Sequence, residues 1–137
     1  MRNRVHTAAL RDERGATVVE FAFIVPLLIV LVLGIVEFGH AFQVSGTLSA
    51  AAREGVRVMA LQNDRNAATA AAQAAAPSLK PALTVDEINI PAMCPAPGAG
   101  TGNETVRLTI NYPMPFLTGF FGSSVTLHGT GVMRCNG

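Results

Sequence analysis

The sequence predicts an α+β fold, in which a long N-terminal helix leads into a small sheet of three antiparallel strands. Three observations point to this class. A run without charged residues extends from Phe21 to Val36, after a short polar stretch. Apolar side chains then recur with the period of a helix up to about residue 62. Beyond Pro81 the period changes to the alternation of strands, most clearly from Thr105 to Tyr112.

The uncharged run is long enough to cross a membrane. A bilayer takes about 20 apolar residues, and 16–36 supplies that length with Glu20 as its single charge. A cleaved secretory signal fits less well, because its apolar core is about 7–15 residues long and small residues follow it as a cleavage site. Here the run is followed by Glu37-Phe38-Gly39-His40. We therefore expect 16–36 to be a transmembrane helix.

Charges on the N-terminal side set the expected orientation. Arginines precede the run at Arg2, Arg4, Arg11 and Arg14. Lysine and arginine next to a membrane helix are retained in the cytoplasm, whereas acids contribute little. We expect residues 1–15 to be a cytoplasmic leader without regular structure, and residues beyond about 40 to lie on the outer side of the membrane.

The segment 37–76 is expected to hold an amphipathic helix and a short second helix. Apolar side chains recur at spacings near three and four, at Phe38, Phe42, Leu48, Ala52, Val56 and Met59. The first helix would thus continue out of the membrane with one buried face. Asn63 and Asp64 offer a break and a new N-cap. The alanine-rich stretch from about 65 to 76 would form the second helix, which Pro77 stops.

The segment 77–137 is expected to form a small β-rich domain outside the membrane. Its middle strand is the alternating stretch Thr105 to Tyr112. A weaker strand is expected over 84–90 and a third over 124–134. Pro113-Met114-Pro115 would end the middle strand, because proline cannot donate to a strand ladder.

Cys94 and Cys135 follow the first and third of these strands. Both are expected on the outer side of the membrane, where disulfides persist. A bond between them would close a loop of roughly 40 residues and stabilise the small domain by about 3–4 kcal/mol. Two free thiols are the alternative. A metal site is not expected, because the sequence has neither Cys-x-x-Cys spacing nor a nearby histidine pair.

Several classes of function find no support in the sequence. The formal net charge is only +1, so nothing indicates a nucleic-acid partner. The histidines His6, His40 and His128 fall in separate segments, and no spacing brings a nucleophile, a base and an acid together. No glycine-rich phosphate loop precedes a helix. We therefore expect no catalytic residue, no cofactor and no small-molecule substrate, and a membrane-tethered enzyme or binding domain is the least favoured interpretation.

Three features leave alternatives open. Glu20 lies near the edge of the membrane run, where a charge is costly by up to about 2.5–3.5 kcal/mol at the helix centre. It either faces lipid head groups or has a partner. Glu37, at the outer end, is expected to face water, with a contact between helices as the alternative. An apolar cluster is formed by Phe116, Leu117, Phe120 and Phe121. It is expected to pack under the sheet, or else to contact another subunit or the membrane.

The junction before the apolar run is a specific motif. It reads Gly15-Ala16-Thr17-Val18-Val19-Glu20-Phe21. This resembles the processing site of type IV-like prepilins, in which a membrane peptidase cuts after the glycine. The stretches 15–28, 34–39 and 51–57 resemble the TadE-like proteins of tight-adherence (Tad, or Flp) pilus systems. The later Asn111-Tyr112-Pro113 and Val132-Met133-Arg134 resemble the C-terminal strands of that family.

The resemblance implies a pilin-like fold and a pseudopilin or minor pilin that helps to assemble or anchor a Tad pilus for surface adhesion and biofilm. Gly15 and Ala16 would flank the scissile bond. Glu20, with Phe21 beside it, would serve assembly by pairing with the new N-terminal amine. The implied partners are membrane lipid, a prepilin peptidase, other pilins and the Tad machinery, in the bacterial inner membrane or the pilus. An uncleaved membrane-anchored subunit of the cell envelope is the alternative.

Overall fold

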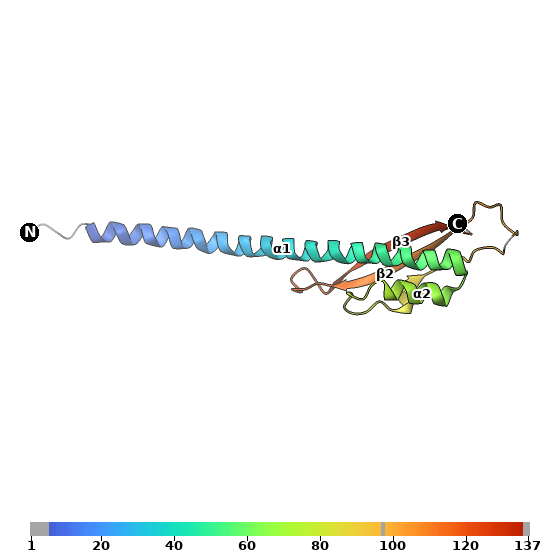
Figure 1. Ribbon diagram of the computed structural model, residues 1–137. Helices are drawn as coiled ribbons and strands as arrows, with labels where there is room; N and C mark the ends of the chain where they lie inside the picture. The colour runs from blue at the N-terminus through green and yellow to red at the C-terminus, as the bar shows by residue number, and fades with distance from the viewer. Residues whose placement is uncertain (1–5, 97, 136–137) are drawn as a thin grey trace, which may run out of the picture. The chain divides into compact units, whose positions relative to one another are not determined.

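A computed structural model describes residues 6–96 and 98–135, with side chains from Gly15 onward. Its elements are two helices, α1 (His6–Gln62) and α2 (Arg65–Ala74), a 3-10 turn, η1 (Val85–Glu87), and three strands, β1 (Ile88–Asn89), β2 (Thr105–Pro115) and β3 (Ser124–Arg134) (Figure 1). This order confirms the predicted α+β class. The chain divides into two units, the first ending at Phe38 and the second beginning at Gly39.

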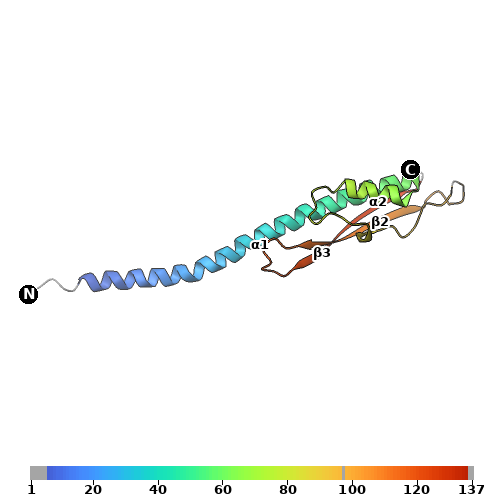
Figure 2. The ribbon, with the colours of Figure 1, turned by 90° about the horizontal axis from the view of Figure 1, so that it is seen from below.

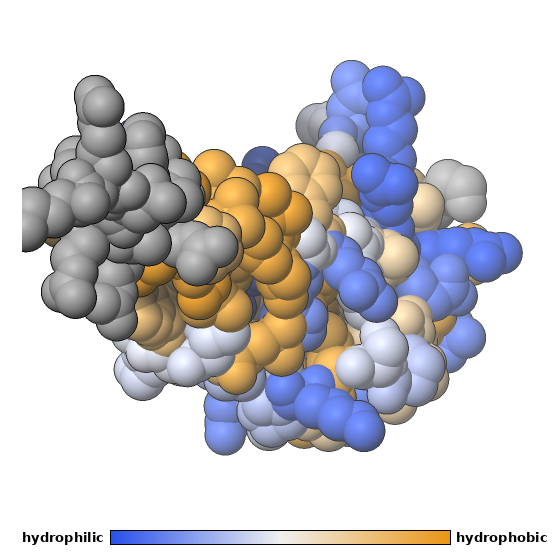
Figure 3. Space-filling model, turned by 90° about the vertical axis from the view of Figure 1, so that its left-hand side faces the viewer, coloured by the Kyte–Doolittle hydropathy of each residue, from blue (hydrophilic) through white to orange (hydrophobic). Residues whose placement is uncertain are grey.

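The first unit consists of the N-terminal part of α1. From Val18 to Val36 its side chains are mostly exposed and apolar, and none of the most apolar window is buried against protein. Among the described residues this is the one helix long and apolar enough to cross a membrane. Pro26 lies inside it, as membrane helices tolerate. Apolar surface shows as orange in the end view of Figure 3. The natural surroundings of exposed apolar side chains on a helix are lipid or other apolar helices.

The start of α1 differs from our expectation. The helix begins at His6 rather than at Ala16, so most of the expected unstructured leader is helical. The reason is local: Ala8-Ala9-Leu10-Arg11 are strong helix formers, and Gly15 costs only about 1 kcal/mol in a helix interior. Residues 1–5 lie outside the described residues.

The second unit packs a three-stranded antiparallel sheet on the C-terminal part of α1, with β2 in the middle of the order β1-β2-β3. Figures 1 and 2 show β2 and β3 running along this part of the helix. The alternation predicted for β2 is confirmed, since its even-numbered residues from Val106 to Met114 are buried and Thr105, Arg107 and Asn111 are exposed. These side chains meet Leu48, Val56 and Met59 of α1 in one core.

Close contact between β3 and α1 depends on two glycines. A Cβ built on Gly129 would lie 2.6 Å from the backbone oxygen of Leu48, and one on Gly131 would collide with the backbone oxygen of Ala52. No side chain fits at either position without moving the strand away from the helix. The sheet therefore lies directly on the helix backbone over this stretch.

The second helix was predicted correctly. Asp64 is its N-cap, and the Asp64 carboxylate accepts from the backbone N–H of Asn66 at 2.8 Å and of Ala67 at 3.2 Å. Ala68 and Ala72 are fully buried on its inner face. The small alanine side chains let α2 pack closely on the rest of the unit.

Two details of the sheet correct the predictions. The strand expected over 84–90 is mostly the turn η1, and only Ile88–Asn89 pairs with β2. The Glu87 carboxylate accepts from the Thr84 backbone N–H at 2.8 Å, which favours a turn over an extended chain. The middle strand continues through both prolines to Pro115. Within the described residues β1 pairs only with Thr109 and Ile110. Beside Pro113 and Pro115 the β1 edge of β2 therefore has no partner strand whose hydrogen bonds the prolines could interrupt.

Candidate functional site

The residues of the junction motif lie on one exposed stretch of α1. Gly15, Ala16, Glu20 and Phe21 are all helical and all exposed. A side chain added at Gly15 would meet open space. Ala16 and Glu20 are four residues apart, so they are neighbours on one face of the helix, about 6 Å apart along the axis. The structure thus places the expected acid one turn from the expected new N-terminus.

Glu20 carries an exposed carboxylate within an apolar surface. Elsewhere on α1, Glu54 pairs with Arg57, whereas among the residues whose side chains are described no ion pair is seen for Glu20. Its neighbours on the helix include Val19, Phe21 and Phe23, which are apolar. If lipid or other apolar helices surround this stretch of α1, the Glu20 carboxylate would attract a cation strongly, because water would no longer screen the interaction.

Glu37, the second acid of the apolar run, differs from Glu20. We expected it to face water, and this was wrong: only 3% of its surface is exposed. Among the described residues no buried side-chain oxygen or nitrogen lacks a hydrogen-bond partner. Glu37 therefore has its interactions within the chain, whereas Glu20 presents its carboxylate outward.

The apolar cluster 116–121 also departs from the expectation of core packing. Phe116 is half-buried against the core, but Leu117, Phe120 and Phe121 are 58%, 65% and 48% exposed. These residues form the turn between β2 and β3, with left-handed backbone at Gly119. The sequence could have indicated this exposure. A short segment with glycines between two strands is typical of a hairpin tip, where few residues are near enough to bury its side chains.

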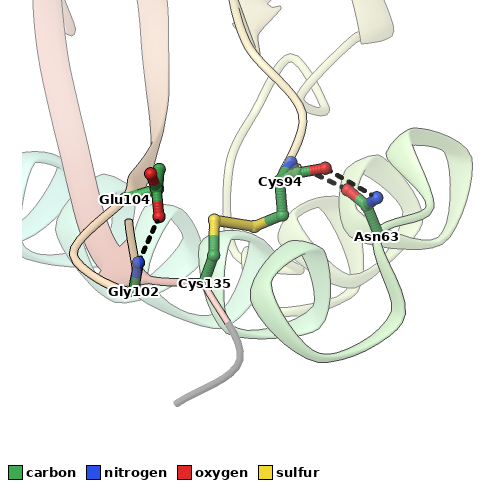
Figure 4. Close-up of a disulfide and its surroundings, with 5 residues drawn as sticks. All are labelled: Asn63, Cys94, Gly102, Glu104 and Cys135. Carbon is green, nitrogen blue, oxygen red and sulfur yellow. Dashed lines mark hydrogen bonds between the residues drawn. A yellow bond between two sulfur atoms is a disulfide. The ribbon is translucent and has the colours of Figure 1, made fainter. Parts of the chain in front are cut away.

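Cys94 and Cys135 form a disulfide, with 5.5 Å between their Cα atoms (Figure 4). Each cysteine has a second connection through its backbone. The Cys135 N–H donates to the Glu104 carbonyl oxygen at 2.9 Å. The backbone of Cys94 exchanges hydrogen bonds with the side chain of Asn63, at the end of α1. Reasoning from the sequence assigned Asn63 only a helix break and missed this second role.

Glu104 orders the loop that precedes β2. One carboxylate oxygen accepts from the Thr101 backbone N–H at 2.6 Å and from the Thr101 hydroxyl at 2.9 Å. The other oxygen accepts from the Gly102 N–H at 3.1 Å. Donation from the Thr101 N–H, with these further bonds, lowers the pKa of the Glu104 carboxyl below its ordinary value. The group is a structural cap on an exposed loop.

No constellation suited to catalysis is seen in the part of the chain that the structure describes. His128 lies exposed on β3, and its Nδ1 is 2.7 Å from Oδ1 of Asn111, the residue opposite on β2. Within the same part, no three His, Cys, Asp or Glu side chains gather where a metal could bind. A groove of about 370 Å³ lies elsewhere, between His40, Lys80 and the hairpin residues Phe116 and Leu117.

Comparison with known proteins gives one match. Residues 15–57 match the family described as TadE-like protein. The match begins at Gly15, the first residue of the junction motif. It ends at Arg57, in the part of α1 that packs on the sheet. No curated protein and no solved structure matches the chain. TadE-like proteins are generally structural and non-catalytic, and the family is associated with Tad pilus machinery.

Proposed function

We propose that this chain, which carries a TadE-like domain over residues 15–57, is a processed pseudopilin or minor pilin that helps to assemble or anchor a Tad-type pilus for surface adhesion. One observation carries the proposal: the family match begins at the glycine of an exposed Gly-Ala-x-x-x-Glu-Phe junction, where the apolar stretch of α1 suited to the membrane begins.

The proposed mechanism begins with cleavage after Gly15. A prepilin peptidase would remove the arginine-containing leader and leave a free amine on Ala16. Glu20 presents its carboxylate one helical turn further on, in apolar surroundings. Within one chain this acid can neutralise the new amine. Between chains, Glu20 of one subunit can bind the Ala16 amine of the next and so set the axial register of neighbouring helices.

The exposed apolar surface of α1 suits the second step. Before assembly, lipid would surround the side chains from Val18 to Val36, which are exposed in the isolated chain. During assembly, helices of other pilins would replace the lipid. The chain would thus leave the membrane with its apolar surface still covered, and the pairing of Glu20 would remove the one charge on that surface.

The proposed location is the bacterial inner membrane, crossed once. The arginines before the span favour an N-terminus in the cytoplasm. The disulfide between Cys94 and Cys135 fits an oxidising compartment for the second unit, the periplasm or the cell surface. In this arrangement 1–15 is the leader, 16–36 the span, and 37–76 and 77–137 the helical and β-rich parts outside.

The alternative is an uncleaved, membrane-anchored subunit of the envelope. One observation favours it: α1 continues without a break from His6 through Gly15 and Ala16. Cleavage therefore requires the peptidase to unwind at least one helical turn. Gly15 lowers this cost, because glycine in a helix interior is less stable than alanine by about 1 kcal/mol.

Replacement of the acid tests the proposed mechanism. In cells that make the pilus, Glu20→Gln should leave the chain in the membrane but reduce its assembly with other pilins and the number of pili, while Glu20→Asp should retain part of the activity. Glu54→Gln is the matched control, since Glu54 is an acid of the same helix whose ion pair with Arg57 is largely exposed. Normal piliation with Glu20→Gln would rule out the role given to this acid.

A further inference from the structure

We propose that the tip of the β2–β3 hairpin, Phe116 to Phe121, docks in the outer leaflet of the membrane that α1 crosses. Leu117, Phe120 and Phe121 would enter the boundary between head groups and acyl chains. The hairpin would then act as a second, peripheral membrane contact that fixes how the second unit lies on the bilayer. The proposal rests on α1 crossing the membrane, which the proposed function also requires.

The first support is the exposure of the tip. Three large apolar side chains lie in one turn and are each about half exposed or more. A soluble surface rarely concentrates such residues without a partner. Segments that lie in the membrane interface bury phenylalanine and leucine side chains at the level of the head groups and upper acyl chains. The composition of this tip suits that depth.

The second support is that contacts within the tip order its exposed aromatic side chains. The Phe120 and Phe121 rings are 5.8 Å apart in an edge-to-face arrangement, and the Phe116 and Phe121 rings are 6.5 Å apart. The Phe116 N–H donates to the Ser123 carbonyl oxygen at 3.3 Å, which closes the turn. The turn is therefore a defined wedge, and little ordering remains to be done when it enters lipid.

The third support is the position of the tip along the chain. Phe116 and Leu117 line the same groove as His40 and Val44 of α1. His40 is only four residues beyond Val36, the end of the uncharged run. Four residues span at most about 14 Å even when fully extended. The bilayer surface thus lies close to this end of the second unit, whatever angle the chain takes at the boundary between the two units.

Two neighbouring side chains fit the same surroundings. Phe42 follows His40 by two residues and is 82% exposed. Lys80 lines the groove beside the tip and is exposed. A lysine next to an apolar surface can lay its hydrocarbon stem along that surface and place its ammonium group among lipid phosphates. An apolar tip with a flanking cation is the pattern expected of an interfacial contact.

Lipid is the occupant we favour over a second copy of the chain. The span already holds the tip within reach of the membrane, so the contact forms within one molecule. Val132 and Met133, which are also exposed apolar residues, lie at the opposite end of β3 from the tip. That end of β3 is far along the strand from the tip and serves as an internal comparison.

Tryptophan fluorescence can test the contact, because the chain has no tryptophan. Phe120→Trp and Phe121→Trp would each place one reporter at an exposed position of the tip. Leu28→Trp reports on the span, and Val132→Trp on the far end of β3. Each full-length variant would be placed in nanodiscs at one chain per disc, with and without lipids brominated on the acyl chain. Brominated lipid quenches only tryptophan that contacts acyl chains.

We expect a blue-shifted emission and a clear loss of intensity for Phe120→Trp and Phe121→Trp, and a larger loss for Leu28→Trp. Val132→Trp should emit like tryptophan in water and keep its intensity.

Quenching of Leu28→Trp alone would overturn the inference and leave the membrane span and the proposed pilin role intact. A blue shift at the tip that requires several chains per disc would indicate contact with a second copy and would also overturn it. An unquenched Leu28→Trp would overturn both the inference and the span.

Discussion

Asn63 and Cys94 exchange two hydrogen bonds across 31 residues of sequence: the Asn63 side-chain N–H donates to the Cys94 carbonyl oxygen at 3.0 Å, and the Cys94 N–H donates to Asn63 Oδ1 at 2.9 Å (Figure 4). Asn63 itself has left-handed backbone, with φ of 51°, a conformation that asparagine adopts more readily than other non-glycine residues. One residue therefore ends α1 and fixes the segment that carries the disulfide.

Loss of this amide should destabilise the second unit. Asn63→Gly keeps the left-handed backbone but removes both bonds, and we expect a loss of about 1–3 kcal/mol in the free energy of unfolding. Urea unfolding of the full chain in detergent, followed by the fluorescence of its single tyrosine, Tyr112, would measure this, because Tyr112 is buried in the unit's core.

Asn63→Asp is the matched control for the two bonds. It keeps an acceptor for the Cys94 N–H but sets a carboxylate oxygen against the Cys94 carbonyl oxygen, so this repulsion should make its loss of stability at least as large as that of Asn63→Gly. Equal stability of Asn63→Gly and the parent chain would show that the exchange of hydrogen bonds contributes nothing.

Reduction of the disulfide should cost more than any single hydrogen bond. Cys94 and Cys135 are 41 positions apart, and closing a loop of that length stabilises the folded state by about 4 kcal/mol in the chain-entropy model. The same unfolding assay with and without reductant measures the difference. The double variant Cys94→Ser/Cys135→Ser should match the reduced chain and no longer respond to reductant. An unchanged unfolding midpoint after complete reduction would contradict this expectation.

Two glycines of the second unit should respond oppositely to alanine. Gly129→Ala places a Cβ within 2.6 Å of the Leu48 backbone oxygen, so β3 must move off the helix, with a loss of about 1–3 kcal/mol. At Gly46, an exposed position of α1, nothing lies within 4 Å of the added atom. Gly46→Ala should therefore stabilise the helix by about 0.5–1 kcal/mol. Urea unfolding that ranks the two variants in the other order would refute the packing of β3 on α1.

The Glu104 carboxylate should make the loop before β2 sensitive to acid. Its pKa is lowered in the folded chain, chiefly by the Thr101 N–H. The stabilisation is complete above the ordinary carboxyl pKa of the unfolded chain and is lost as the pH falls through the lowered folded value. A carboxyl NMR titration should give a Glu104 pKa below that of an unstructured glutamate. Thr101→Val, which removes only the hydroxyl donor, should bring it partly back, and an ordinary Glu104 pKa in the parent chain would contradict the cap.

The sequence was most informative where one local pattern decides the structure. The alternation from Val106 to Tyr112 predicted the buried face of β2, and the helical period predicted the packing of Leu48 and Met59. The same period also put Phe38 and Phe42 on the buried face of α1, and this was wrong, since they are 77% and 82% exposed. Asp64 marked the start of α2 in the same way. For β2 and α1 the periodicity of the side chains and their burial lead to one answer, and for α2 the capping residue does.

Prediction from the sequence was weaker where residues far apart along the chain determine the surroundings of a side chain. The hydrogen bonds of Asn63 depend on Cys94, which only the fold brings close, and the local pattern around Glu37 does not indicate that it is buried. Composition alone could not predict whether Phe120 is exposed or packed in the core, because apolar residues occur in both positions. For the junction, the motif located Gly15 and Glu20, and their roles depend on a peptidase and on neighbouring subunits outside this chain.

The most direct test of the proposed function is the N-terminal sequence and intact mass of the membrane-extracted protein, with and without the prepilin peptidase of the host. The account predicts a chain that starts at Ala16 when the peptidase is present and at Met1 when it is absent. A start at Met1 in both would contradict processing and leave the chain as an uncleaved anchor.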